Sequence, residues 1–291
     1  MKNKKFPWFS YIVVIVGCIS MVFPFLDMFF TSFKGQSELT SIDYKLLPNS
    51  FDFKNFENAF KSMKMGKLFF NSLIVSSSVT LLVLLTSTLA GYSLTKLKFP
   101  GRNTFFKFTL ATMMFPAFLF LIPNFYIMVH FPLVGGNDIT GEGGTGGMAS
   151  TLWALILPFT VSGFGIFLMR QFIMGIPDSL IEAARIDGAS ELRIFLQIVT
   201  PMTMPALATL AIFTFIGQWN ELIWSLLIYT VNNDLATLPV GIQMLQSYLD
   251  PNLTKAIVSA ALTISIIPIF LIFIFLQKYY IKGMNMSGLK E

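Results

Sequence analysis

Residues 68–94 read LFFNSLIVSSSVTLLVLLTSTLAGYSL, and no charged side chain occurs between Lys67 and Lys96. A helix of about 20 mostly apolar residues is long enough to cross the hydrocarbon core of a bilayer. This stretch exceeds that length without a single charge. It therefore decides the fold class, and the sequence predicts an all-α membrane protein.

The composition of the whole chain agrees with a membrane protein. Only 12% of the 291 residues are charged and 54% are hydrophobic, whereas soluble domains carry about 25% charged residues. We assign the formal net charge of +5 to cytoplasmic loops, which are rich in Lys and Arg, and expect no nucleic-acid partner. One cysteine, Cys18, and one histidine, His130, are too few for a disulfide framework, a histidine-based metal site or a catalytic triad.

Five further stretches have the length and apolar character of membrane spans, although prolines interrupt several of them. Such kinks are tolerated because neighbouring helices re-satisfy the freed backbone groups. The first stretch also resembles a signal peptide, but it is too long and no small-residue cleavage site follows it, so we expect it to be retained. We expect one transmembrane domain over residues 1–291, with spans at about residues 8–30, 68–94, 108–128, 150–169, 203–228 and 256–277.

Loop charges predict the orientation of these spans. Lys and Arg gather in both tails, after the second span and after the fourth span, whereas the loops after the third and fifth spans have almost none. The positive-inside rule therefore places both termini in the cytoplasm, and we expect a multi-pass protein of a bacterial inner membrane. The first outer loop, residues 33–67, disagrees with six lysines against four acids, but it is long and mixed in sign.

The longest cytoplasmic connection, about residues 174–202, predicts a short helix, a glycine turn and a second helix. Its central part reads IPDSLIEAARIDGAS from Ile176 to Ser190. Asp178 can cap the first helix and Ser190 the second. Gly188 stands where a left-handed helix end is favoured, because glycine adopts positive φ without a steric penalty.

The first of these short helices carries a small apolar knob formed by Ala183 and Ala184. Glu182 and Arg185 flank the knob, which can enter a groove of a partner protein while the flanking charges set its orientation. On the residues alone, a linker that lies on the membrane surface without a partner explains the segment about equally well.

A family resemblance favours the partner. The spacing Glu182-Ala183-Ala184, three residues, Gly188, nine residues, Ile198, two residues, Pro201 is similar to the signature loop of binding-protein-dependent ABC permeases. Thr200 departs from the leucine that is usual there. The chain further resembles the carbohydrate-uptake group, of the maltose-permease second-subunit type, at residues 31–34, 90–102, 153–158, 219–221, 237–241 and 278–283.

The resemblance implies an ABC importer permease fold with six transmembrane helices and a cytoplasmic helix–turn–helix coupling loop. It implies a heterodimer with a second homologous permease, together with two ATPase subunits. It also implies an extracytoplasmic solute-binding protein that delivers a carbohydrate, namely an oligosaccharide. ATP and Mg would bind to the ATPase, so this chain would hold no cofactor and would not be an enzyme. The ATPase-coupling residues would be Glu182, Ala183, Ala184, Asp187 and Gly188.

A second set of candidate residues lies late in the fifth predicted span. Trp219, Asn220 and Glu221 are expected along the substrate pathway, because an acid beside an aromatic ring suits hydroxyl binding and stacking on a sugar face. Charges at membrane depth usually face the bundle interior. Asp27 is the other such acid, for which a polar pair or solvation at the membrane interface is the simpler explanation.

The glycine-rich outer loop at residues 135–147 leaves its role open. Asp138, Thr140 and Glu142 resemble the first half of a calcium-binding loop, but Ala149 stands where that loop needs a bidentate glutamate. We therefore prefer a loop that meets the binding protein.

Two other functions fit the sequence less well than a permease. A secondary transporter driven by an ion gradient would favour inverted repeats, discontinuous helices and buried carboxylates near mid-membrane. No convincing repeat is evident, and the carboxylates lie towards the outer side. An intramembrane enzyme would need more than one outer-boundary histidine, and no HExxH motif occurs.

Overall fold

The computed structural model describes residues 8–248 and 251–287, and every regular element in these residues is helical. The chain divides into two compact units, Met1–Lys67 with Gly241–Ile267 and Leu68–Val240 with Pro268–Glu291. The all-α membrane fold that the sequence predicts is confirmed, whereas the single domain over residues 1–291 stays a prediction.

The first unit contains α1 (Trp8–Thr31), α2 (Gln36–Leu39) and α3 (Lys54–Ser62), with parts of α14 (Leu238–Tyr248) and α15 (Pro251–Ser287). Phe33 organises the segment after α1, because its ring meets those of Phe51, Phe53 and Phe56 at centroid distances of 5.2–5.4 Å. Edge-to-face pairs of this kind stabilise a fold beyond simple burial.

The second unit is built around α4 (Met65–Lys96), the helix that contains the uncharged stretch. Its other elements are α5 (Arg102–Thr112), η1 (Ala117–Phe120), α6 (Leu121–Val129), η2 (Gly147–Ser150), α7 (Trp153–Ile156), η3 (Leu157–Phe159), α8 (Gly163–Met174), α9 (Asp178–Ile186), α10 (Glu191–Ile194), the π-helix η4 (Phe195–Val199), α11 (Thr200–Met202), α12 (Met204–Trp219), α13 (Ile223–Tyr229) and η5 (Asn233–Leu235).

Three of the predicted spans are continuous helices and three are bent. Trp8–Thr31, Met65–Lys96 and Lys255–Lys278 are each long and apolar enough to cross a membrane. The predicted span at 108–128 is not one continuous helix, because α5 and the pair η1–α6 meet at 94°. The break falls before Pro116, which has no N–H for a helical hydrogen bond and disfavours helical backbone in the residue before it.

The fourth and fifth predicted spans are also broken. The segments 153–159 and 163–174 meet at 46° after Pro158, and the segments 191–202 and 204–219 meet at 77°. The predicted fifth span at 203–228 is two helices rather than one, because α12 ends at Trp219 and α13 starts at Ile223.

Small residues let α4 and α8 approach closely. A Cβ atom at Gly91 would lie 3.0 Å from both the backbone nitrogen of Arg170 and the Cβ of Met169. A Cβ atom at Gly165 would lie 2.3 Å from the Oγ of Ser87. Membrane helices pack through small residues in this way. α8 also packs against α5 and α12, so α4 and α8 form the framework of the second unit.

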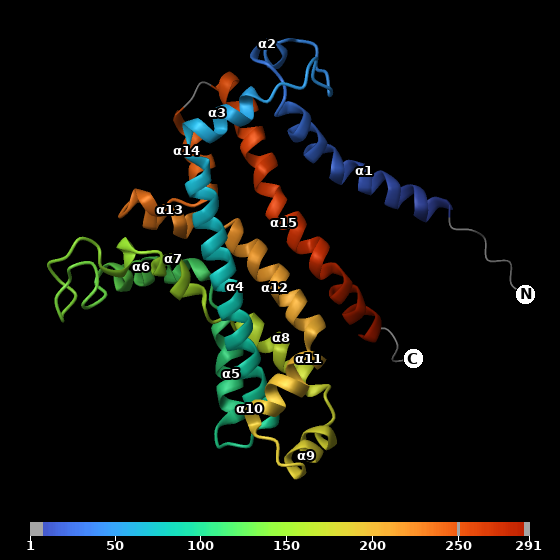
Figure 1. The fold of residues 1–291 in the computed structure, drawn as a ribbon, viewed down its shortest axis with the longest axis vertical. Coiled ribbons are helices and arrows are strands. Elements are labelled where there is room, and N and C mark those ends of the chain that lie inside the picture. The colour runs from blue at the N-terminus through green and yellow to red at the C-terminus, as the bar shows by residue number, and fades with distance from the viewer. Residues whose placement is uncertain (1–7, 249–250, 288–291) are drawn as a thin grey trace, which may run out of the picture. The chain divides into compact units, whose positions relative to one another are not determined.

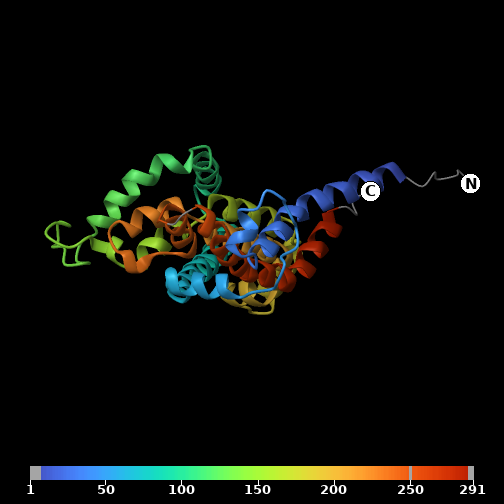
Figure 2. The ribbon, with the colours of Figure 1, turned by 90° about the horizontal axis from the view of Figure 1, so that it is seen from above.

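Two features project from that framework. The turn between α4 and α5 lies at the same end of the unit as α9 and α10 (Figure 1). The loop between α6 and η2, which contains the glycine-rich residues, extends away from the helices of this unit (Figure 2).

Candidate functional site

The predicted helix, glycine turn and second helix are present at α9, Gly188 and α10. Gly188 has φ +81°, its N–H donates to the Arg185 carbonyl at 3.0 Å, and the Ala189 N–H donates to the Ala184 carbonyl at 3.0 Å. These two bonds form the Schellman ending of a helix, which requires a left-handed residue at the position of Gly188. Ser190 begins α10 as predicted, since its hydroxyl accepts from the Arg193 N–H.

The two alanines of the knob differ in burial. Ala184 is half-buried and packs with Ala189 against the core of this chain, which is the apolar contact that accompanies a Schellman ending. Ala183 is exposed, as are Asp187 and Gly188. The apolar surface that α9 exposes therefore contains Ala183 but little of Ala184, and it is narrower than the sequence suggested.

One apolar residue of this face was missed by sequence reasoning. Ile186 is the last residue of α9 and is 86% exposed, whereas Ile181 is 2% exposed and belongs to the core. The helical spacing from Ala183 to Ile186 places both on one face, which was the available signal. Glu182 is also exposed and completes a small apolar surface with an acidic edge.

The base of the loop is held by charged groups. Asp178 does not cap α9 with its side chain, because Pro177 is the N-cap residue. Instead its Oδ1 accepts from Lys96 Nζ at 2.6 Å, and this bond holds the pKa of the Asp178 carboxyl below its usual range. A hydrogen bond to the ionised form lowers a carboxyl pKa in this way.

At the other end of α9, Arg185 Nε donates to Glu191 Oε1 at 2.7 Å. The second oxygen of Glu191 accepts from the Tyr92 hydroxyl at 2.5 Å. Arg185 first, and Tyr92 second, hold the pKa of the Glu191 carboxyl below its usual range. Sequence reasoning used Lys96 only as a topology marker and did not connect Tyr92 with this loop.

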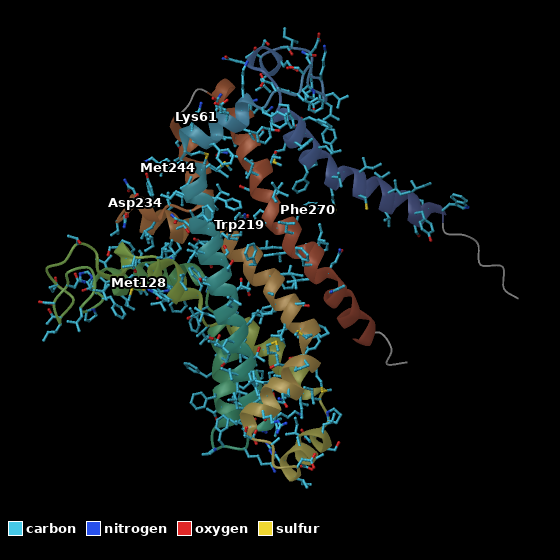
Figure 3. The ribbon with its side chains drawn as sticks, viewed as in Figure 1. Lys61, Met128, Trp219, Asp234, Met244 and Phe270 are labelled. Atoms are coloured by element: carbon cyan, nitrogen blue, oxygen red, sulfur yellow. The ribbon has the colours of Figure 1, made fainter. Side chains whose placement is uncertain are left out.

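The second candidate set lies at the junction of α12 and α13. Trp219 is 2% exposed, and its ring stacks on Phe215 and meets Phe69 edge to face. Figure 3 shows it beside α4. The indole therefore packs inside the unit in this conformation and presents no open face for a sugar. Asn220 is exposed, and its amide donates to the Ile216 carbonyl.

Glu221 caps α13. Its Oε1 accepts from the Trp224 N–H at 2.8 Å, and its Oε2 accepts from the N–H and the hydroxyl of Ser225, both at 2.9 Å. The carboxylate thus satisfies the free N–H groups at a helix start, where a negative charge is favourable. Trp224 fixes α13 in turn, because its indole N–H donates to the Ala154 carbonyl.

Glu221 also borders a groove of about 380 Å³ in the second unit. Gln218 lies in the same groove, and its buried amide nitrogen has no hydrogen-bond partner among the described residues. Apart from these two, the lining is mostly apolar: Val79, Val83, Pro158, Phe159, Val161, Ser162, Phe164, Phe213, Thr214 and Gly217.

The glycine-rich loop is an ordered turn. Asp138 Oδ1 accepts from the Thr140 N–H, the Thr140 hydroxyl and the Glu142 N–H at 2.6–3.0 Å. Asn137 is 8% exposed and its amide donates to the Val129 and Phe131 carbonyls. No group of three metal-binding side chains forms among the described residues.

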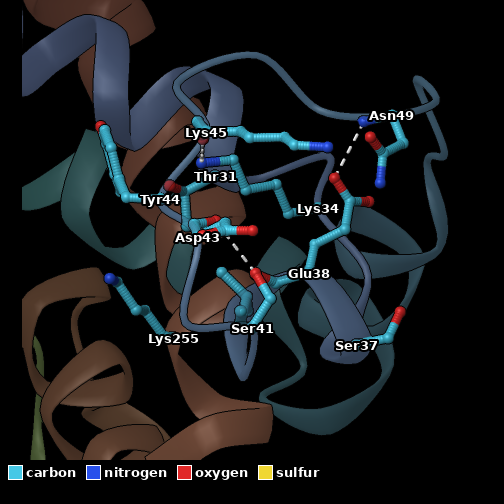
Figure 4. A pocket seen from close by; sticks show the side chains of 11 residues that line it. Thr31, Lys34, Ser37, Glu38, Ser41, Asp43, Tyr44, Lys45, Asn49 and Lys255 are labelled. Carbon is cyan, nitrogen blue, oxygen red and sulfur yellow. Dashed lines mark hydrogen bonds between the residues drawn. The ribbon is translucent and has the colours of Figure 1, made fainter.

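The first unit has a polar pocket of about 260 Å³ at the end of α1 (Figure 4). Lys34 is buried there, donates to the Lys45 carbonyl at 2.6 Å and lies over the Tyr44 ring. Asp27 accepts from the Tyr44 hydroxyl at 2.9 Å, so it forms a polar pair within the protein. These bonds shape the segment that follows α1.

The comparisons with known proteins agree with this architecture. Residues 83–286 match the family model "Binding-protein-dependent transport system inner membrane component". The chain is 33% identical to the arabinooligosaccharides transport system permease protein AraQ of Halalkalibacterium halodurans over the full length of both. It is 30% identical to the diacetylchitobiose uptake system permease protein NgcG of Streptomyces coelicolor, covering 95% of this chain and 86% of that protein.

A solved structure has the same fold. One chain of a bacterial ABC transporter involved in the import of the polysaccharide alginate superposes with a TM-score of 0.78 at 23% identity, covering 93% of this chain and 95% of the other. Together with the helix–glycine–helix loop and its Schellman turn, the family match settles the assignment: the chain belongs to the inner-membrane permease components of binding-protein-dependent transport systems.

Proposed function

We propose that this chain is one of two permease subunits of an ATP-driven importer, and that it carries an oligosaccharide across the inner membrane. An extracytoplasmic binding protein delivers the sugar, and two separate ATPase subunits bind ATP and Mg and supply the energy. Both termini of the chain lie in the cytoplasm. The observation that carries the proposal is the α9–Gly188–α10 loop, which is tied down at its base and exposed at its outward face.

The outward face of α9 is the contact with the ATPase. Ala183 and Ile186 are apolar and exposed, and Glu182 lies beside them. A protruding helix that offers a few apolar anchors suits a groove on a partner. Burying the exposed surface of one isoleucine contributes about 1.5–3 kcal/mol, so Ile186 is the strongest single anchor that this face offers.

The groove bordered by Gln218 and Glu221 is this chain's share of the sugar pathway. The apolar lining of this groove suits the C–H face of a sugar ring. Asn220 supplies a further exposed amide. The second permease subunit supplies the opposite wall.

Two of the relatives favour an oligosaccharide over a monosaccharide. The two permeases named above serve arabinooligosaccharides and diacetylchitobiose. Both substrates are oligosaccharides, and the similarity to these two permeases covers at least 95% of this chain. The length of the sugar and its monosaccharide units follow from the binding protein rather than from this subunit.

An ion-coupled transporter would use Glu221 to bind a cation or a proton. Both oxygens of this carboxylate already accept hydrogen bonds from α13. Releasing them would leave the first N–H groups of that helix without a partner. The groove therefore favours sugar contact over ion coupling.

The function is tested in two steps. The binding protein is purified from cells and its bound sugar is identified by mass spectrometry; uptake of that sugar is then measured with an ionophore that collapses proton and sodium gradients, and separately after ATP depletion. We expect uptake to survive the ionophore and to stop without ATP. The opposite pattern contradicts the proposal.

A further inference from the structure

Two side chains of α4 reach the two ends of α9. Tyr92 and Lys96 are four residues apart, so they lie on one face of α4 in successive turns. Lys96 Nζ donates to the Ile176 carbonyl and to Asp178 Oδ1, both at 2.6 Å, at the beginning of α9. Tyr92 reaches the far end through Glu191, which accepts its hydroxyl at 2.5 Å.

Both contacts are made from inside the protein. The Lys96 side chain is 5% exposed, whereas its partner Asp178 is 78% exposed. Tyr92 is 4% exposed and its ring packs against Phe195 at 5.7 Å. A buried charged or hydroxyl group that loses its partner incurs the desolvation cost of that group. The buried ends of the two bonds therefore strongly favour keeping their partners, and the connection from Tyr92 to α9 is completed by the half-exposed ion pair between Glu191 and Arg185.

The end of α4 that carries these side chains is itself fixed. Arg102 donates to the Thr95 and Leu97 carbonyls at 3.1–3.2 Å and so satisfies the free carbonyls at the end of the helix. One residue before Tyr92, Gly91 packs directly on the backbone of α8. A displacement of this end of α4 is therefore passed on to α8.

The other contacts of α9 with the unit are few. Ile181 is the only buried residue of α9, and Ala184 is half-buried. Apolar contacts resist separation but are not directional, so they allow α9 to roll or slide on the surface beneath it. The Lys96–Asp178 bond at the start of α9 opposes that movement, and so does the chain of bonds from Tyr92 through Glu191 to Arg185 at its end.

We propose that Tyr92 and Lys96 are the positioning residues that make α9 and the cytoplasmic end of α4 move as one body. Closure of the ATPase pushes on the outward face of α9. The two connections made by Lys96 and Tyr92, called the ties below, transmit this displacement to α4 and, through Gly91, to α8. The inference rests on the proposed function for the origin of the push. The ties themselves are a property of this chain alone.

The test compares two double variants. Tyr92→Phe with Lys96→Met removes both ties and keeps the aromatic ring and the aliphatic stem in their buried places. Tyr126→Phe with Lys107→Met makes the same chemical changes at exposed positions outside the loop and is the matched control. Cys18 is replaced by alanine in all proteins so that single labels can be placed.

Spin labels at positions 98 and 179 report the distance between the end of α4 and α9, and double electron–electron resonance measures it. The complex is measured without nucleotide and after trapping with ATP, Mg and vanadate. We expect wild type and control to give one narrow distance in both states. We expect the Tyr92/Lys96 variant to give a broadened distribution that shifts on trapping.

A second readout separates positioning from docking. We expect the ATPase to co-purify equally with all three proteins, whereas hydrolysis stimulated by the sugar-loaded binding protein falls roughly tenfold in the Tyr92/Lys96 variant, as the loss of about 1.4 kcal/mol of coupling predicts. A narrow, unshifted distance with normal stimulation overturns the inference.

Failure of the proposed function has a different signature. In that case no ATPase co-purifies with wild type and trapping changes nothing. The label distance in the purified permease still tests the ties, because a distribution equally narrow in both double variants contradicts them and a selective broadening supports them.

Discussion

Substitution of Gly188 isolates the part that backbone conformation plays in the coupling loop. The residue has φ +81°, and a Cβ atom added to it would meet no heavy atom within 4 Å. The whole cost of a side chain within this chain is therefore backbone strain. That cost is about 1–2 kcal/mol for alanine in the left-handed region and up to about 3 kcal/mol for a β-branched residue.

These energies predict a graded series. Asparagine visits the left-handed region readily, so Gly188→Asn should keep the Schellman turn. Gly188→Ala should lower the population of the turn, and Gly188→Val should lower it by roughly a hundredfold, because each 1.4 kcal/mol is a factor of ten. Without the turn, α10 is no longer directed back into the core through Ile194.

The assay is co-purification of the ATPase together with hydrolysis stimulated by the sugar-loaded binding protein in liposomes. We expect wild type and Gly188→Asn to be similar, Gly188→Ala to be weaker and Gly188→Val to be uncoupled, while all four insert into the membrane. Normal values for Gly188→Val would refute the reasoning. Equal loss in the Asn and Val variants would also refute it, since the two side chains are similar in size and the requirement would then be for space in the partner.

Three further predictions concern the cap, the pH dependence and the topology. Glu221→Gln should lower the free energy of unfolding by roughly 0.5–2 kcal/mol, as loss of a good cap does, and should lower sugar uptake more than assembly of the complex. Thermal unfolding measures the loss of stability and transport assays measure uptake. Unchanged uptake removes Glu221 from the pathway. Because the pKa values of Asp178 and Glu191 are lowered in the folded protein, the bonds that these carboxylates accept are present at neutral pH and are lost as the pH falls through the lowered values. The protection of the amides of residues 176–191, measured relative to their intrinsic exchange rates, should therefore be constant above about pH 5 and fall below about pH 4, and a fall already at pH 6 contradicts this origin. Single cysteines at positions 140 and 285 should be labelled from opposite sides of sealed cells, and labelling of both from one side contradicts the topology.

The membrane fold and the coupling loop could be predicted because each has a local cause. The uncharged length of residues 68–94 requires a spanning helix, and Gly188 followed by Ser190 requires a helix end and a new start. Both features depend on neighbours in sequence. The same reasoning placed Asp178 as a cap, which failed because Lys96, 82 residues earlier in the chain, takes its carboxylate instead.

The features that were not predicted depend on packing between distant segments. The orientation of Ala184 into the chain follows from the Schellman turn and the core beneath it, neither of which a hydrophobic pattern of two alanines specifies. Trp219 was expected beside a sugar, but Phe69, 150 residues away, contacts its ring. The bend before Pro116 was visible as a proline, although the sequence gives no measure of its 94° angle.

The most direct test of the central claim is photo-crosslinking from Ile186 in the liposome complex with its ATPase and binding protein. Ile186 is 86% exposed on α9, and Ile139 is 79% exposed in the glycine-rich loop, so the two positions are matched in residue type and exposure. We expect a photoreactive amino acid at position 186 to form an adduct with the ATPase subunit, in a yield that changes on trapping with ATP, Mg and vanadate, and the same amino acid at position 139 to form none. Adducts of position 186 with lipid alone, or an ATPase adduct from position 139, would contradict the account.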